Sequence, residues 1–326
     1  MSRLLSFGSF VAVLVLYGVL GISGLATADN YPSKPITFVD PTTAGSGAAR
    51  WSEVFAQHIQ PYLGQPMEIT FKPGGAANAE AVYINQHPAD GYTIGKAFGS
   101  LAGYMNLPGF KPHPEDFIVI LRTDKQLFAL GVLASSPFKS IKDVVNYAKQ
   151  HPGKLAVGAT KVGSVHQRHI INFEDAAGIQ FKYIPYKGSG DVVKDVLGGF
   201  LPIGLAQPGL WLPLAKAGKV RMLVLFNENR IKALPDVPVP SDFGYKYEFT
   251  HQWYGAMVKK GTPPDRIKKL QAAFHKVVES EAYKQYLAAN PGVEPIWSDD
   301  QVKLTKELAK SRGEFRAYMK SAGLIK

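Results

Sequence analysis

Short apolar runs alternate with helical patterns along almost the whole chain, and no other feature of the sequence limits its fold as strongly. The runs at 36–39, 67–71 and 92–97 have the length of buried strands, and an apolar face of helical period begins at about Ala48, after the first of them. Alternating strands and helices are typical of βαβ units, which build parallel sheets covered by helices. The sequence therefore predicts an α/β fold.

The alternation restarts near residue 128 and changes again after a proline-rich stretch at 234–240. The second series contains five expected strands, at 128–133, 155–158, 181–185, 203–206 and 221–226. One more strand is expected at 253–258, and the sequence from Pro264 onward reads as mostly helical, with a break at 290–292.

Two series of strands predict two lobes, each large enough for a core of its own. We expect the C-terminal helical segment to pack back on the first lobe, which makes that lobe discontinuous. The first lobe is then 29–126 plus 236–326, and the second is 127–235.

The N-terminus has the pattern of a secretory signal peptide over residues 1–28. Arg3 supplies the positive charge, 4–20 is a mostly apolar segment, and Ala26-Thr27-Ala28 has the small residues that a signal peptidase needs before a cut at Asp29. A permanent membrane anchor is the alternative, but the apolar run is marginal in length for a spanning helix. We therefore predict export to the periplasm and cleavage of the signal.

The composition excludes several classes of site. The chain has no cysteine, so disulfides, thiolate metal sites and cysteine nucleophiles are all excluded. The formal net charge is +11, but no aromatic-basic binding motif accompanies it, so we expect no nucleic-acid partner. Instead of nucleic-acid binding, we interpret this charge as a positive field that favours anionic ligands.

Motifs of catalysis are missing as well. The sequence has no G-x-G-x-x-G after the first strand, no Walker-type motif and no G-x-S-x-G elbow. His166 and His169 lie three residues apart, but no carboxylate at ligand spacing accompanies them. We expect no metal, no cofactor and no enzymatic activity, with an exported hydrolase as the alternative to be tested by turnover.

Several predicted strands end in small loops that are rich in Gly, Ser or Thr and that open a helix. Ligands of parallel α/β sheets bind at the carboxyl ends of the strands, and a helix N-terminus favours an anion there. A single loop of this kind is weak evidence, since most such loops are only tight connections. Four or five of them on successive strands predict a cleft for a small anion.

Beyond these patterns, the chain without its signal peptide resembles the Bug-type substrate-binding proteins of tripartite tricarboxylate transporters over nearly its whole length. The segments that carry the resemblance are 31–36, 63–66, 72–74 with Asn78, 90–93, 151–155, 184–189, 216–219, 234–238, 253–255 and 261–263. Each segment is short, and the order and spacing of the whole set make the resemblance specific.

The resemblance implies a two-lobed periplasmic-binding-protein architecture of the type II-like, flytrap kind, with a ligand cleft between the lobes. It implies a monomer that captures a small organic acid in the periplasm and delivers it to the integral-membrane permease subunits of a transporter. A sensory module that reports the ligand to a membrane kinase is an alternative that the sequence does not separate. The positions that match the ligand loops of the family are Thr42, Thr43, Gly45, Ser46, Gly75, Ala76, Asn78, Phe98, Ser100, Thr160, Lys161, Ser164, His166, Tyr186, Gly188, Gln207 and Trp211.

The sequence departs from the family pattern in two of these loops. The first commonly reads Pro-Pro-Gly-Gly with a following Asp, whereas here it reads Thr42-Thr43-Ala44-Gly45 with Ala48 near the Asp position. In the second lobe a frequent Phe-Asp-Asn is replaced by 205–207, and the bulky Trp211 stands where a small residue is usual. The lost acids and the added indole suggest an organic carboxylate, with aromatic acids and dicarboxylates as candidates.

Four side chains are candidates for contacts specific to such a ligand. Phe98 or Trp211 could pack against an aromatic ring, although Trp211 is equally well explained as a core residue. Lys161 and His166 could pair with a second carboxylate, although an exposed lysine and a helix-capping histidine are the more ordinary explanation, since lysines are mostly exposed.

Overall fold

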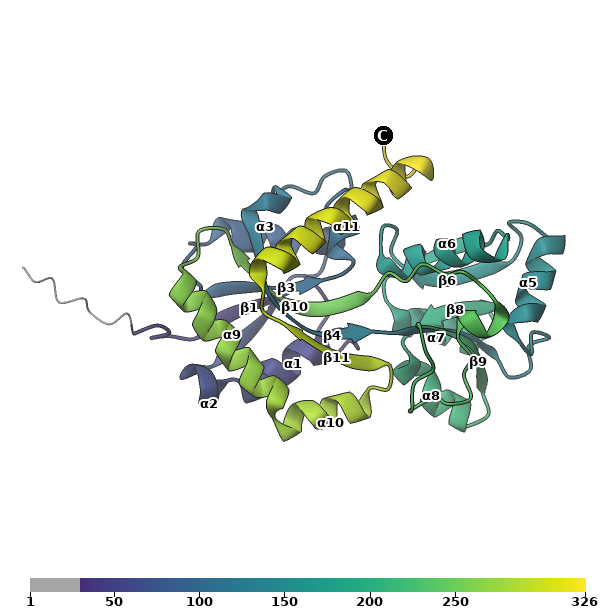
Figure 1. The fold of residues 1–326 in the computed structure, drawn as a ribbon, viewed down its shortest axis with the longest axis horizontal. Helices are drawn as coiled ribbons and strands as arrows, with labels where there is room; N and C mark the ends of the chain where they lie inside the picture. The colour runs from purple at the N-terminus through teal and green to yellow at the C-terminus, as the bar shows by residue number, and fades with distance from the viewer. Residues whose placement is uncertain (1–29) are drawn as a thin grey trace, which may run out of the picture.

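The computed structural model of this protein describes residues 30–326, so the predicted signal peptide lies outside the described residues. Two lobes lie side by side, each built on a mixed sheet with helices packed against it (Figure 1). This confirms the predicted α/β class and two-lobed architecture. Within residues 30–326, none of the helices combines the length and the apolar character needed to span a membrane.

The first lobe contains a six-stranded sheet in the order β11-β4-β10-β3-β1-β2. Strands β1, β2 and β3 are parallel, whereas β10 runs antiparallel to both β3 and β4, and β11 antiparallel to β4. The strand bounds are β1 Ile36–Asp40, β2 Met67–Phe71, β3 Thr93–Phe98, β4 Phe117–Gln126, β10 Gln252–Lys259 and β11 Val293–Ser298.

Helices cover this sheet and bury its apolar side chains. They are α1 Ala49–His58, α2 Gln60–Leu63, α3 Asn78–Gln86, α4 Leu101–Tyr104, α9 Pro264–Glu279, α10 Glu281–Ala289 and α11 Gln301–Ser321, with short 3-10 turns at Gly75–Ala77 and Pro114–Asp116. Trp51 of α1 stacks on Phe274 of α9, and Phe55 contacts both Phe274 and Tyr283. The C-terminal helices therefore pack against α1 of the first lobe.

The second lobe contains a five-stranded sheet in the order β7-β6-β8-β5-β9, with β6 parallel to both β7 and β8. Its strands are β5 Phe128–Leu133, β6 Ala156–Thr160, β7 Lys182–Tyr186, β8 Ile203–Ala206 and β9 Val220–Phe226. Its helices are α5 Ile141–Gln150, α6 Val165–Ala177, α7 Ser189–Leu197 and α8 Pro208–Lys216.

Two connections join the lobes. Leu127 alone separates β4 of the first sheet from β5 of the second, and residues 227–251, with a 3-10 turn at Pro240–Phe243, lead back from β9 to β10. The predicted lobe boundaries fall in these connections. The exact residues at which one lobe ends and the other begins stay a proposal.

Two strands depart from the expected pattern. The tail was expected to be mostly helical, but β11 lies within it and pairs with β4 as an edge strand. Its sequence is only half-buried and contains Pro295, so it lacks the apolar alternation that marks a central strand. The loop expected after the strand at 155–158 also begins later than expected, because Ala159 and Thr160 belong to β6.

Candidate functional site

The two lobes meet at two of the predicted strand-end loops, one from each sheet. The hydroxyl of Ser100, which follows β3, accepts a hydrogen bond of 3.0 Å from the backbone N–H of Val165 at the start of α6. The same hydroxyl donates to the side-chain oxygen of Gln252 on β10 at 3.0 Å. Ser100 therefore joins the positive end of α6 in the second lobe to the sheet of the first lobe.

Close backbone packing surrounds this hydrogen bond. A Cβ atom added to Gly103 of α4 would lie 1.9 Å from the carbonyl oxygen of Gly163 in the loop before α6. Met319 near the end of α11 also approaches Gly163, and the guanidinium of Arg168 on α6 lies 5.2 Å from the ring centre of Tyr318. The C-terminal helix therefore contacts both lobes at the seam, as its position in Figure 1 suggests.

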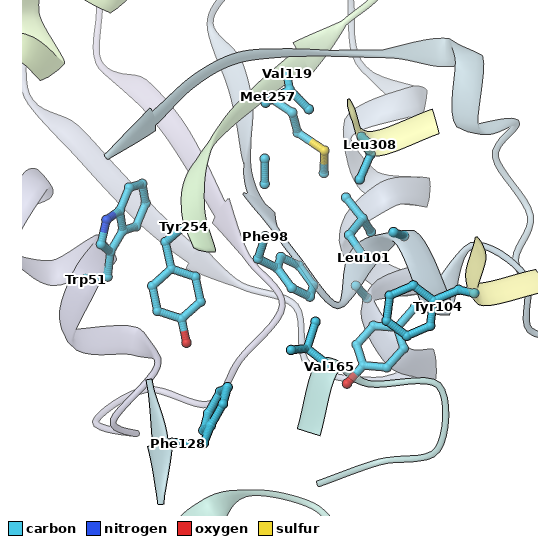
Figure 2. Close-up of a cluster of buried hydrophobic side chains, with 14 of the residues drawn as sticks. Trp51, Phe98, Leu101, Tyr104, Val119, Phe128, Val165, Tyr254, Met257 and Leu308 are labelled. Carbon is cyan, nitrogen blue, oxygen red and sulfur yellow. The ribbon is translucent and has the colours of Figure 1, made fainter. Parts of the chain in front are cut away.

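Aromatic side chains line the seam from both sides. Figure 2 shows Phe98 and Tyr254 of the first lobe together with Phe128 and Val165 of the second in one buried cluster. Phe98 is 7 % exposed and is the last residue of β3, two positions before Ser100. Phe98 thus lies at the carboxyl end of a parallel strand, and its role as an aromatic surface for a ligand stays a prediction.

A second meeting point of the lobes encloses a cavity of about 50 Å³. The first lobe contributes the start of α1 and the segment between α10 and β11, and the second lobe contributes the start of α8. The lining residues are Gly47, Arg50, Gln126, Gln207, Gly209, Leu210, Tyr286, Asn290, Pro291, Gly292 and Val293. Two predicted loops, 42–47 and the region of Gln207, are thus brought together.

A buried ion pair supports the loop that follows β1. Asp40 and Lys96 are both almost fully buried, and their charged atoms lie 3.2 Å apart. Burial opposes ionisation of Asp40, but Lys96 and hydrogen bonds from Ser52 and Thr42 outweigh it and hold the pKa of Asp40 below its usual value. Thr42 donates from its backbone to Asp40 at 2.8 Å, so the ion pair fixes the first residue of the predicted ligand loop.

His166 is a polar side chain of the second lobe that lies buried at the seam, with no hydrogen-bond partner among residues 30–326. His166, in the first turn of α6, is 6 % exposed, and neither ring nitrogen has a hydrogen-bond partner in the described part of the chain. Its ring packs 4.1 Å from that of Phe128, and burial lowers its pKa to about 3, so the imidazole is uncharged at neutral pH. Burial also lowers the pKa of Lys161.

The remaining predicted residues lie at or beside the strand ends where the sequence placed them, with Thr160 the last residue of β6, Tyr186 the last of β7 and Asn78 the first of α3. Ser164 caps α6 and accepts a hydrogen bond from Thr160, Ser46 accepts one from the start of α1, and Asn78 accepts one from the backbone of Lys111. Gly45, Gly75 and Ala76 have positive φ, and Gly188 caps α7. Thr43 lies in an exposed turn, and Tyr186 donates to Asp195 at 2.7 Å. Whether these residues touch a ligand stays a prediction.

Trp211 requires a correction. Its side chain is fully buried in the core of the second lobe, its indole N–H donates to the carbonyl of Ala129 at 3.1 Å, and Gly131 and Gly204 leave room for the ring. Trp211 therefore fills the space between α8 and the sheet, and it presents no face to a ligand.

Sequence reasoning missed three groups at the seam. Lys96 could have been noticed as a charged residue within an otherwise apolar strand, Thr93–Phe98. Arg50 and Gln252 carried no local signal, because each acquires its place only through contacts with distant segments. Across residues 30–326, no cluster of three or more His, Asp or Glu is arranged to hold a metal ion.

Residues 52–318 match a family described as "Tripartite tricarboxylate transporter family receptor". The chain belongs to this family. A Cupriavidus necator relative, "UPF0065 protein in gbd 5'region", is 30% identical, and the match covers 97% of this chain and 95% of the relative. "Protein BugT" of Bordetella pertussis is 27% identical, with 93% of each chain covered.

Solved structures agree with this assignment. A TctC solute binding protein from Polaromonas superposes with a TM-score of 0.71 at 25% identity, and the match covers 89% of this chain and 99% of that one. The resemblance to Bug-type proteins is confirmed. The family is one of receptors, and the chain's solved neighbours include a solute binding protein and a periplasmic transporter, so the prediction that the chain is not an enzyme is confirmed as well.

Proposed function

We propose that this receptor binds a small organic carboxylate between its lobes and delivers it to the permease subunits of a tripartite tricarboxylate transporter. The observation that carries the proposal is the meeting of predicted ligand loops from both sheets, at Ser100 with Val165 and at Gly47 with Gln207. A ligand held by both lobes contacts its full set of partners only when the lobes are closed, so it shifts the population toward the closed form.

The chemistry of the seam favours an anion. Arg50 and Lys161 supply positive charge, and the positive end of α6 lies at the seam, where the backbone N–H of Val165 donates to Ser100. No acidic side chain lines the cavity beside Arg50. A negatively charged ligand would balance this charge, and the permease would then recognise the closed lobes.

Thermal unfolding tests the first part of the proposal. Residues 29–326 would be unfolded with and without mono-, di- and tricarboxylates, aromatic acids and amino acids, after refolding to remove any bound ligand. A ligand at 100 times its dissociation constant adds about 2.7 kcal/mol to the stability of the native state and raises the midpoint by several degrees. If no carboxylate raises the midpoint, the carboxylate assignment is wrong.

Uptake of the labelled ligand tests the second part. We expect uptake by cells to require both this receptor and the permease. A receptor that only reports to a membrane kinase would leave uptake intact when it is deleted, and that result would contradict delivery to the permease.

A further inference from the structure

An open groove on the first lobe lies apart from the cavity beside Arg50. It has a volume of about 850 Å³, and its walls come from the segment 105–114, which follows α4, and from residues 312–326 at the end of α11 and beyond. This end of α11 extends toward the second lobe (Figure 1). The groove, called the C-terminal groove below, is large enough to hold several side chains of a partner.

The lining of the C-terminal groove carries positive charge and no acidic side chain. Arg312 and Arg316 lie four residues apart on α11, so their side chains share one face of the helix. Neither takes part in an ion pair within residues 30–326, and any guanidinium nitrogen of Arg312 that lacks a protein partner is open to solvent. Lys326 adds an ammonium group and, as the last residue of the sequence, a carboxylate, so the two arginines give the groove its positive charge. Like charges at this spacing repel each other, and an anion held by both would relieve the repulsion.

Apolar side chains complete the lining. Met105 and Pro108 come from the segment after α4, and Leu324 and Ile325 come from the residues after α11. Leu324 is 36 % exposed, so it is available to a partner. Arginine and methionine are both enriched in protein interfaces. The groove therefore suits a polypeptide segment that carries acidic and apolar side chains.

Both walls of the groove border the contact between the lobes. Asn106 joins the walls, because its side-chain amide donates to the carbonyl oxygen of Arg312 at 2.9 Å. On α4, Gly103 packs against the carbonyl of Gly163 in the second lobe, and on α11, Met319 approaches Gly163 as well. A partner in the groove would therefore touch two segments whose contacts with Gly163 are lost when the lobes separate.

We propose that the C-terminal groove is the docking site for an acidic segment of the permease, whose carboxylates pair with Arg312 and Arg316. This inference rests on the proposed function, which requires a partner that distinguishes closed lobes from separated ones. The place of the groove beside Gly163 meets that requirement. The two arginines favour an acidic partner over a basic or neutral one.

Charge reversal tests the docking site in cells that express the full chain and the permease. Arg312→Glu combined with Arg316→Glu should lower uptake of the labelled carboxylate identified by the thermal panel by roughly tenfold or more, because like charges would then face each other across the interface. Calorimetry on the purified variant should give an affinity within twofold of the wild type, since neither arginine lines the cavity beside Arg50. Arg312→Gln combined with Arg316→Gln repeats the test if the reversed variant fails to fold.

The same helix offers a matched control. Lys303 and Lys306 are exposed residues of α11 that lie outside the groove lining. Lys303→Glu combined with Lys306→Glu makes the same change of charge and should leave both uptake and affinity unchanged.

Photo-cross-linking identifies the occupant of the groove. The cells would be supplied with the acids of the thermal panel and would carry benzoylphenylalanine at one chosen position of the receptor. In place of Leu324 it should form a cross-link to a tagged permease subunit, and in place of Lys306 it should not.

The outcomes separate this inference from the proposed function. Wild-type uptake by the reversed variant, a loss of uptake that reduced affinity explains, or a cross-link from position 324 to a second copy of the receptor would overturn the docking site and leave a carboxylate receptor. Binding to phosphatidylglycerol vesicles that charge reversal abolishes, without a cross-link to the permease, would assign the groove to a membrane surface and would overturn it too. If no acid raises the unfolding midpoint but position 324 cross-links to the permease, the docking site stands and the carboxylate assignment is wrong.

Discussion

The substitution Gly103→Ala should weaken ligand binding without unfolding either lobe, because Gly103 and Gly163 belong to different lobes and touch across the seam. The new Cβ would lie 1.9 Å from the carbonyl oxygen of Gly163, which is backbone and cannot rotate away. The two segments would have to separate by roughly 1.5 Å to reach ordinary contact distance. The hydrogen bond of 3.0 Å between Ser100 and Val165 would then exceed bonding range.

These contacts set the free-energy cost of lobe closure in Gly103→Ala. Overpacking costs about 1–3 kcal/mol. Most of this cost applies to the closed form, because separated lobes remove the clash with Gly163 and leave the tight approach of 3.0 Å to the ring of Phe315. A penalty of that size on closure weakens affinity by roughly 5- to 150-fold. We expect this loss in calorimetry with the ligand that the thermal panel identifies, while the unfolding midpoint without ligand changes little.

A second glycine provides the matched control. Gly313 lies in α11 with open space around its added Cβ, so Gly313→Ala should bind as the wild type does. Small-angle scattering would measure whether ligand still compacts each variant. If Gly103→Ala binds within twofold of the wild type, the described seam is not the closed interface of the receptor, and the reasoning fails.

Three further predictions concern buried groups. Lys96→Met leaves the Asp40 carboxylate buried without its cation. It should lower the free energy of unfolding at pH 7 by about 3–5 kcal/mol, measured by urea unfolding. Without the cation, burial raises the pKa of Asp40, so the loss should shrink as the pH falls toward 4; an equal loss at both pH values would argue against the ion pair. Trp211→Ala should lower the free energy of unfolding by about 3–5 kcal/mol, since the indole fills a core. The affinity for the ligand, measured at 15 °C, should stay unchanged, and a large change would show that Trp211 contacts the ligand. Burial lowers the pKa of His166 from 6.5 to about 3, so the unfolded chain binds the proton more readily and stability falls as pH drops through this window. His166→Gln should flatten the pH dependence of the melting temperature between pH 7 and 4.5, and an unchanged slope would show that the imidazole is not buried uncharged.

Much of this architecture could be predicted because burial leaves a local pattern. Strands such as Phe128–Leu133 and Ile203–Ala206 are buried along most or all of their length, so they read as apolar runs. Their ends were visible because a change from apolar to small or polar residues accompanies the turn into a helix. Ser100, Ser164 and Gln207 were therefore placed at strand ends from the sequence alone, and the structure brings these ends to the seam.

What escaped prediction depends on long-range contacts. Strand β11 is an edge strand with few buried residues, so it has little apolar pattern of its own. Trp211 illustrates a different limit, because a bulky aromatic side chain has the same local pattern whether it packs against a sheet or against a ligand. Arg50 gained its significance only from Gln207, which is 157 positions away in the sequence and is brought close by the seam.

The place of β10 in the first sheet has a consequence for the order in which the lobes are completed. This strand lies between β3 and β4, at the centre of its sheet, yet it follows every strand of the second lobe in the chain. A chain synthesised from its N-terminus has all five strands of the second sheet by residue 226, but it lacks the centre of the first until residue 259. Until then β3 has one unpaired edge and β4 has two, because both neighbours of β4 come later in the chain, and unpaired edges are sites for aggregation. We therefore expect a chain truncated before residue 252 to fold its second lobe and to leave its first lobe dependent on chaperones.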